Sequence, residues 1–541
     1  MNRKIIALLF TLFLISTEGF GQLRPSLDGL KLERTLQLIK NLYVDDVDSE
    51  KLTETAIRAM LSDLDPHSSY LDKEEVKAMN EPLQGDFEGI GISFNMLTDT
   101  LYVMEVISGG PSQKVGILPG DKILYVNDTL IAGVKMNTND VIGKLRGPKG
   151  TEVKVKVLRR GVPQLLEFRI IRDKIPIYSI DASYMVDNNT GYIRLSRFAA
   201  TSTDEFRKAE NALLAAGMKN LILDLTGNGG GILQTATDIT DEFLENGKLI
   251  VYTEGKNQPR YSINSTDKGN FKKGNLVVLV DEGSASASEI LSGAVQDWDR
   301  GVIVGRRTFG KGLVQRQLPL PDGTMIRLTV ARYYTPTGRS IQKPYENGDL
   351  ESYNMDVLNR YNRGELIHAD SIHFPDSLKY KTLVNKRTVY GGGGIMPDYF
   401  VPLDTATLTN LHRDLIAKGI VNRISISEVD RNRKTLLATY PDAETFKKGY
   451  GISPQIIDNL KQMAAADSIK WDDEQFERSQ SLLFTQLKAL IARDLYNSSA
   501  YFRIMNDENE IFKEAFRIIN DEERYNNLLK GLANKVSSPN S

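Results

Sequence analysis

The stretch NLVVLVDEGSASASEILSGAVQDW, residues 275–298, predicts a strand, a turn and a helix in direct succession. The unbroken apolar run LVVLV is typical of a strand that is buried on both faces. After the turn, Ile290, Leu291 and Val295 form an apolar stripe at helical spacing. A buried strand joined by a short turn to an amphipathic helix is the repeating unit of an α/β fold.

The sequence on both sides of this stretch continues the pattern. Between residues 176 and 345, predicted strands alternate with predicted helices, in segments such as GYIRLSRF, STDEFRKAENALLAAG, NLILDL and GVIVG. We therefore predict an α/β core whose strands are largely parallel.

The regions outside this core have different patterns of apolar and polar residues. Residues 27–80 carry leucines and isoleucines at helical spacing, and the chain from about residue 405 onward does the same. Residues 87–172 form short strands separated by glycines, among them the strictly alternating VKVKV. Residues 345–388 are polar and irregular, so we interpret them as an insertion.

Composition narrows the class of protein. A chain of 541 residues exceeds what one hydrophobic core usually serves, so we expect about three or four domains. The formal net charge of -2 provides no basic field for nucleic acid, which we do not expect as a partner. The chain has no cysteine, which excludes disulfides, thiolate chemistry and zinc-thiolate sites.

The N-terminal sequence MNRKIIALLFTLFLISTEGFGQ has the pattern of a signal peptide. A basic start precedes an apolar stretch from Ile5 to Ile15, and the small residues Gly19 and Gly21 are spaced like a cleavage site. The apolar stretch is shorter than the roughly 18 to 20 residues that span a bilayer. We expect cleavage near Gly21 and an exported, periplasmic protein with no integral membrane segment after signal removal.

The turn in the opening stretch places three serines at alternate positions, Ser284, Ser286 and Ser288. A strand-to-helix turn presents a side chain at a helix N-terminus, where free N–H groups favour negative charge. Alternate helical positions point about 200° apart, so Ser286 and Ser288 cannot both face one cleft. Ser284 is a candidate helix cap, and all three serines are also small enough to serve only in tight packing.

Two glycine-rich loops accompany the serines. NLILDLTGNGGGIL, residues 220–233, ends a predicted buried strand and could point backbone N–H groups at a developing oxyanion. Its spacing fits neither common phosphate-binding pattern. VGRRTFGKGLVQ, residues 304–315, places Lys311 between two glycines beside apolar side chains, where desolvation would lower its pKa, although an exposed turn lysine fits the same pattern.

Histidine is the usual proton acceptor, and the chain has four. Three of them, His368, His373 and His412, lie in the insertion or near the C-terminal helices. His67, in DPHSSY, is the serious candidate among the four, and it could equally form local hydrogen bonds.

A series of motifs, in this order along the chain, carries a family resemblance: YVDDVDSEKL, LDPHSSYL, FEGIGIS, GPSQKVGILPGDKILYVND, LRGPKGTEV, DLTGNGGG, GSASASEI, TFGKGLVQ and YYTPTGRSIQ. With these motifs the chain resembles the carboxyl-terminal processing proteases, also called tail-specific proteases, which are serine proteases with a serine/lysine dyad. The motifs run through most of residues 35–345, and GGGGIMPDYFVP resembles the strand that closes the family's core.

The resemblance implies an α/β protease core of crotonase- and ClpP-like βα units, with an inserted, mainly β PDZ domain and helical N- and C-terminal regions. The expected organisation is a signal peptide over 1–21, an N-terminal helical region over 22–85, a PDZ domain over 86–172, the protease core over 173–344, the insertion over 345–388, a core-closing strand over 389–404 and a C-terminal helical region over 405–541.

Carried over by position, the resemblance makes Ser286 the nucleophile, Lys311 the general base and Gln315 the residue that orients the lysine. It places the oxyanion hole at the N–H of Ala287 and in the glycine loop, at Gly230 with Gly231 adjacent. In that loop Thr226 stands where the family commonly has arginine, and Gly229 where it commonly has proline, which leaves the geometry open. His67 belongs to a motif that the resemblance makes structural, and Ser288 becomes a packing residue.

The PDZ domain implied by the resemblance accounts for specificity. A substrate peptide would add as an extra strand, and backbone N–H groups of the GIG loop would hold its terminal carboxylate. The expected tail-binding residues are Gly89, Ile90, Gly91 and Ile92. Apart from the surrounding motifs, GIG is also compatible with an ordinary glycine-rich hairpin.

We therefore expect a serine endopeptidase that acts on proteins with free C-terminal tails and needs no metal or cofactor. The C-terminal helices could bind an adaptor or mediate self-association. The alternative is a catalytically inactive, PDZ-containing periplasmic scaffold, against which the retention of Ser286, Lys311 and Gln315 argues.

Overall fold

The computed structural model describes residues 26–97 and 99–532. The predicted signal peptide, residues 1–21, lies outside the described residues. Within the described part, no helix is both long enough and apolar enough to cross a membrane.

The core is a six-stranded sheet that lies at the centre of the chain's α/β segment. Its strands, in spatial order, are β10 (Ile180–Met185), β11 (Thr190–Leu195), β12 (Asn220–Asp224), β15 (Leu276–Val280), β16 (Val302–Gly305) and β21 (Tyr399–Phe400). All neighbours from β11 to β21 are parallel, and β10 runs antiparallel at one edge. Every side chain of β15 is buried, as its apolar run predicts. The predicted α/β core is confirmed.

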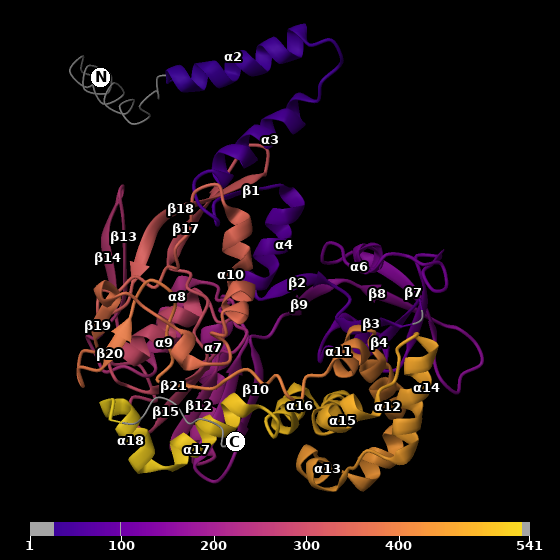
Figure 1. The fold of residues 1–541 in the computed structure, drawn as a ribbon. Coiled ribbons are helices and arrows are strands. Elements are labelled where there is room, and N and C mark those ends of the chain that lie inside the picture. The colour runs from indigo at the N-terminus through magenta and orange to yellow at the C-terminus, as the bar shows by residue number, and fades with distance from the viewer. Residues whose placement is uncertain (1–25, 98, 533–541) are drawn as a thin grey trace, which may run out of the picture.

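Helices cover both faces of this sheet (Figure 1). One face packs against α7 (Ser202–Ala215), α8 (Leu233–Asp241) and α9 (Ala287–Asp297) in a large apolar cluster. The other face packs against α17 (Glu510–Asn520) and α18 (Glu522–Lys530), through a second cluster. The last helices of the chain are therefore part of the core.

A second, smaller sheet lies beside the core. It contains β1 (Ser69–Leu71), β18 (Met325–Tyr334), β13 (Leu249–Gly255) and β14 (Gln258–Asn264), with β17 (Leu313–Pro319) also paired to β18. Pairing of β1 with β18 aligns Ser69 with Arg327, and so brings the DPHSSY segment to the hairpin that follows Lys311.

The segment predicted to be mainly β forms its own sheet, which we call the β domain (residues 86–176). In spatial order its sheet contains β3 (Ile92–Leu97), β4 (Thr100–Val106), β5 (Lys122–Val126), β7 (Glu152–Leu158) and β8 (Leu166–Ile171), with β6 (Thr129–Leu130) paired to β5 and with the helices α5 (Pro111–Val115) and α6 (Thr138–Leu145). β3 is an edge strand. The domain joins the rest of the chain through the paired strands β2 (Asp86–Gly89) and β9 (Asp173–Pro176).

The N-terminal region is helical, as predicted. It contains α2 (Leu27–Leu42), α3 (Ser49–Ser62) and α4 (Lys73–Gln84). α2 has no buried side chain and extends away from the rest of the molecule (Figure 1).

The polar segment 345–388 is more regular than its sequence suggests. It contains α10 (Leu350–Asn362), the 3₁₀ turns Ala369–Ser371 and Asp376–Leu378, and a hairpin of β19 (Lys379–Lys381) and β20 (Thr388–Tyr390). Two side chains of α10, Tyr353 and Arg360, are buried.

The predicted C-terminal helices are also present. They are α11 (Asn410–Ala417), α12 (Ile420–Thr439), α13 (Ala443–Gly449), α14 (Pro454–Ala466), α15 (Asp473–Leu495) and α16 (Ser498–Met505), which precede the two helices on the core sheet. They share two apolar clusters.

The β domain contacts α12. Arg160 donates to the carbonyl oxygen of Asp430 (2.7 Å), and a shared pocket is lined by Met104 from the β domain and by Ile426 from α12. Both of these apolar side chains are buried. The face of the β domain used here is that of β4 and the loop before β5, and no described strand pairs with the outer edge of β3.

Replacing Ile426 by aspartate should weaken this contact, because the variant removes roughly 1.5 to 3 kcal/mol of apolar burial and introduces a charge. We expect faster amide hydrogen exchange in residues 107–121 of the β domain. Ile416→Asp, at an exposed position of α11, is the matched control. Equal exchange in the two variants would show that the contact does not restrain the β domain.

Candidate active site

Ser286 occupies the strand-to-helix turn in a strained conformation. It is the N-cap of α9, with φ 55° and ψ −110°, and its side chain is partly exposed. A non-glycine residue in such a region costs on the order of 1–3 kcal/mol, and residues of this kind cluster at functional sites.

The three serines that the sequence leaves as alternatives differ in burial and in their hydrogen bonds. Ser284 is fully buried and donates to the carbonyl oxygen of Leu225 (2.8 Å). Ser288 is fully buried and donates to the carbonyl oxygen of Asn228 (2.8 Å). The expected cap at Ser284 is wrong, because the N-cap of α9 is Ser286, two residues later, whereas Ser288 does pack inside.

The glycine loop lies directly against this turn. A Cβ at Gly230, where φ is +100°, would lie 2.7 Å from the carbonyl oxygen of Ala285 and 2.9 Å from the nitrogen of Ala287. The Gly230 N–H itself donates to Asn228 Oδ1 (2.9 Å). Among the described residues, none accepts a hydrogen bond from the N–H of Ala287 or Gly231. The glycine loop and the serine turn thus lie together, as predicted. The N–H groups of Ala287 and Gly231 remain without an acceptor among the described residues.

Glu289 connects the serine turn to the lysine loop. Its fully buried carboxylate accepts hydrogen bonds from Ser286 N (2.8 Å), Gly310 N (2.7 Å), Lys311 N (2.9 Å) and Thr308 Oγ1 (2.5 Å). Burial raises the pKa of Glu289 to about 7, against these hydrogen bonds, which favour the ionised form.

Tyr333, on β18, makes a second connection. Its buried hydroxyl lies 2.6 Å from the carbonyl oxygen of Lys311 and 3.1 Å from that of Ser286, and donates to both. The backbones of Ser286 and Lys311 are therefore held together by two buried side chains, Glu289 and Tyr333.

Lys311 lies in an environment that disfavours its charge. Desolvation first, and next the positive charge of Arg327, lower its pKa to about 8, against the carboxylates of Glu289 and Asp65, which favour the charged amine. No described residue, Ser286 included, forms a hydrogen bond or ion pair with Lys311 Nζ. The structure joins the two predicted catalytic residues through their backbones rather than through a side-chain hydrogen bond.

Gln315 belongs to the same surroundings. It lies on β17 and donates to Thr329 Oγ1 (3.3 Å), which in turn donates to Asp65 Oδ1 (2.9 Å). Asp65 also accepts from the N–H groups of His67 and Ser68. Gln315 therefore connects to the DPHSSY segment and not directly to Lys311.

His67 lies close enough to Lys311 to be affected by its charge. Burial, and next the charge of Lys311, lower the pKa of His67 to about 4, so its ring is neutral at pH 7. Its Nε2 lies 2.9 Å from the hydroxyl oxygen of Tyr353 on α10.

Three residues of this site, Glu289, Tyr333 and Asn228, were not predicted from the sequence. Glu289 alone had a usable signal, because it follows Ser286 at the spacing of a capping box.

The GIG loop of the β domain has free backbone donors. No described residue accepts a hydrogen bond from the N–H of Ile90 or Gly91, which directly precede the edge strand β3. The loop turns at Gly91, where φ is +76°.

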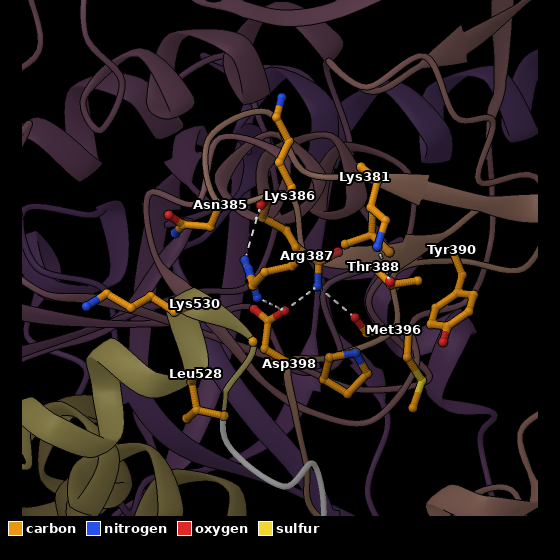
Figure 2. Close-up of a pocket in the computed structure, with 14 residues that line it drawn as sticks. Lys381, Asn385, Lys386, Arg387, Thr388, Tyr390, Met396, Asp398, Leu528 and Lys530 are labelled. Atoms are coloured by element: carbon orange, nitrogen blue, oxygen red, sulfur yellow. Dashed lines mark hydrogen bonds and ion pairs between the residues drawn. The ribbon is translucent and has the colours of Figure 1, made fainter.

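Figure 2 shows a separate pocket of about 250 Å³ between the β19–β20 hairpin, the segment before β21 and α18. Arg387 lines it, but its guanidinium already donates to Asp299 (2.6 Å) and Asp398 (2.5 Å). The predicted catalytic and tail-binding residues, all within the described part of the chain, are not among its lining residues.

Comparison with known proteins identifies the family. Residues 189–351 match the model of peptidase family S41, and residues 89–170 match a PDZ domain. The chain is 38% identical over 314 residues to a carboxy-terminal-processing protease of Bartonella bacilliformis, which covers 56% of this chain and 70% of the relative. The chain belongs to the carboxy-terminal processing proteases of family S41. The carboxy-terminal processing protease CtpA of Bacillus subtilis is 35% identical over 358 residues, or 64% of this chain and 76% of that protein.

Further matches cover the two ends. Residues 21–75 match the N-terminal domain of the activating protease CtpB, and residues 411–497 match a family of unknown function. Among solved structures, a photosystem II D1 C-terminal processing protease is 29% identical with a TM-score of 0.35, covering 59% of this chain and 91% of that one. The S41 match ends at residue 351, at the start of α10.

Replacing Gly230 by alanine should destabilise the protease, because the new Cβ would contact backbone atoms and φ would remain positive. We expect a loss of about 1–3 kcal/mol in the free energy of unfolding by urea. Gly229→Ala is the matched control, since a Cβ there meets nothing within 4 Å, and its stability should stay within about 0.5 kcal/mol of the wild type. Equal losses in both variants would contradict the close approach of loop and turn.

Proposed function

We propose that this S41 protease is a serine endopeptidase that cleaves proteins near their C-terminal tails, with Ser286 as nucleophile and Lys311 as general base. The observation that carries the proposal is the connection of Ser286 and Lys311 through Glu289 and Tyr333. Family membership supports the same reaction class.

The chemistry follows from the environment of the lysine. With a pKa of about 8, a sizeable fraction of Lys311 is neutral near pH 7.5 and able to accept the hydroxyl proton of Ser286. The serine oxygen then bonds to the peptide carbonyl carbon, and the protonated lysine returns its proton to the leaving amine. Water then gives a proton to Lys311 and bonds to the acyl carbon, the bond from that carbon to the Ser286 oxygen breaks, and Lys311 returns the proton to the serine oxygen. The acyl group leaves as an acid that ionises to a carboxylate.

The developing oxyanion needs backbone donors. We assign it to the N–H of Ala287 and to the glycine loop, where Gly231 has an N–H with no acceptor among the described residues. Gly230 permits the close approach, and its own N–H would become available on leaving Asn228. Gln315 would orient Lys311 by exchanging its contact with Thr329 for one with the amine.

Tail recognition rests on the β domain. A peptide would pair with the open edge of β3, and its terminal carboxylate would accept from the loop formed by Gly89, Ile90, Gly91 and Ile92. Export to the periplasm, through the signal sequence in residues 1–21, would place the enzyme among exported substrates.

Ser286→Ala and Lys311→Ala should each lower kcat/KM on an unfolded peptide by about 10³-fold or more, because each removes a group essential to acylation. Lys273→Ala, at an exposed lysine, should retain activity. Cleavage unchanged in the Ser286 and Lys311 variants would overturn the dyad. Binding of peptide by the wild type without any cleavage would favour the scaffold alternative.

Tail recognition is tested by comparing two peptides that differ only in a free or an amidated C-terminus. We expect kcat/KM to fall for the amide, because it lacks the negative charge that the Ile90 and Gly91 N–H groups would bind. Equal values for both peptides would contradict the proposed carboxylate site.

The pH dependence of kcat/KM should show an acid limb with a midpoint of about 8. Lys311 acts as a base only when neutral, so activity appears as the pH rises through its lowered pKa and is lost below it. A midpoint close to the usual lysine value of about 10.5 would show that Lys311 is not desolvated during the reaction.

A further inference from the structure

Helix α10 lies against the loop that carries Lys311, residues 307–312. Arg360 of α10 is 1% exposed and donates to two consecutive carbonyl oxygens of this loop, those of Arg307 (2.6 Å) and Thr308 (3.1 Å). Both carbonyl groups precede the glycine–lysine–glycine turn. Arginine thus fixes the start of the loop in a geometry that a single-point donor would not reproduce.

Tyr353, two turns earlier on α10, reaches the other end of the loop. It is 5% exposed, and its hydroxyl accepts from Gln342 Nε2 (3.4 Å). Gln342 in turn accepts from the N–H of Gly312 (2.8 Å), the residue after Lys311. The tyrosine hydroxyl also contacts His67 Nε2 (2.9 Å), so one side chain joins the lysine loop to the DPHSSY segment.

The space between these two contacts is filled by aromatic rings and one cation. Phe309 meets the ring of Tyr353 edge to face, with centroids 5.8 Å apart. The ammonium of Lys343 lies 4.0 Å and 3.9 Å from the centroids of these two rings and donates to the Tyr353 carbonyl oxygen (2.9 Å). The Lys343 N–H donates to the carbonyl oxygen of Gly310 (2.9 Å). Packing of this kind excludes water from the side of the loop that faces α10.

We propose that Tyr353 and Arg360 are positioning residues for the general base, and that α10 holds the Lys311 loop in its desolvated, catalytically competent conformation. The inference rests on the proposed role of Lys311. It gives the insertion a function that the sequence left undecided, and both residues lie beyond residue 351.

The charged groups that face Lys311 are contributed by other elements. They are Arg327 from β18, Glu289 from α9 and Asp65 from the segment before β1, whereas His67 from the same segment is neutral at pH 7, with Lys311 and Lys343 among the charges that act on it. α10 contributes no charge to this set. Loosening the contacts between α10 and the loop should therefore act on Lys311 through hydration and loop position. Both changes would raise the pKa of the amine toward its usual value.

The test uses Tyr353→Phe and Arg360→Met in the full-length protein, with Arg360→Lys as the conservative variant. The controls are Tyr361→Phe and Arg363→Met, at the end of the same helix. The Tyr361 side chain is 42% exposed, and the Arg363 side chain pairs with Glu365 and is 55% exposed. Two quantities are measured as functions of pH, kcat/KM on a tail-bearing peptide and the rate of phosphonylation of Ser286 by a fluorophosphonate probe, which releases fluoride.

We expect kcat to fall about three- to tenfold in Tyr353→Phe and further in Arg360→Met, with KM within about twofold, since the base and not peptide binding is affected. The acid limb of both pH profiles should move upward by about half a unit or more. Arg360→Lys should recover part of the loss, and the controls should match the wild type.

Midpoints and kcat values equal to those of the controls would overturn the proposal. Should Arg360→Met fail to fold, as judged by circular dichroism, Tyr353→Phe decides, because it keeps the ring and removes only the hydroxyl. If the wild type is neither phosphonylated at Ser286 nor dependent on it for cleavage, the proposed function itself fails. Phosphonylation of Ser286 with an unchanged pH profile in Tyr353→Phe rejects only the role of α10.

Discussion

A single buried carboxylate, that of Glu289, accepts hydrogen bonds from the backbone of the serine turn and from the backbone of the lysine loop. These two segments follow different strands of the core sheet, β15 and β16, which lie side by side and parallel. Adjacent parallel strands have their C-terminal ends at the same edge of a sheet, but their pairing does not fix the distance between the loops that follow them. Glu289 supplies that constraint, and Tyr333 adds a second from β18.

Close packing around this constraint explains the unusual backbone. Ser286 adopts a positive φ, and Gly230 approaches the same turn so closely that a Cβ would contact its backbone. A strained backbone conformation of this kind persists only where several surrounding contacts hold it in place. Here the surroundings include Ser284 and Ser288, whose hydroxyls hold the turn to Leu225 and Asn228. The two buried serines thus help to hold the turn that carries Ser286.

Much of the fold could be predicted from local patterns. The buried run at 276–280 and its alternation with helices predicted the parallel sheet, because burial on both faces imposes an apolar strand. The glycine loop and the Lys311 loop stood out by their glycines and apolar neighbours, but it was the family resemblance that distinguished Lys311 from an ordinary turn lysine. Periodicity could not choose between Ser286 and Ser288, since it reports direction relative to a helix and not the position of a cleft.

What could not be predicted depends on contacts between distant segments. The pairing of β1 with β18 joins residues more than 250 positions apart in the sequence, and it places His67 and Asp65 beside Lys311. Arg360 and Tyr353 lie in a stretch that was interpreted as a polar, irregular insertion, yet both are buried. Arg360 donates to backbone carbonyl groups of the lysine loop, and the Tyr353 hydroxyl has His67 and Gln342 as partners. No local pattern records the partner of a buried arginine.

The proposed role of Lys311 as a base requires its amine to lose a proton far more easily than the amine of an ordinary lysine. The most direct measurement is a pH titration of the lysine side-chain amines by nuclear magnetic resonance in nitrogen-15-labelled protein, with the Lys311 resonance assigned by its absence from Lys311→Met. The arrangement described above predicts a midpoint of about 8 for Lys311. A midpoint above about 10, in the range of exposed lysines, would contradict its role as the base.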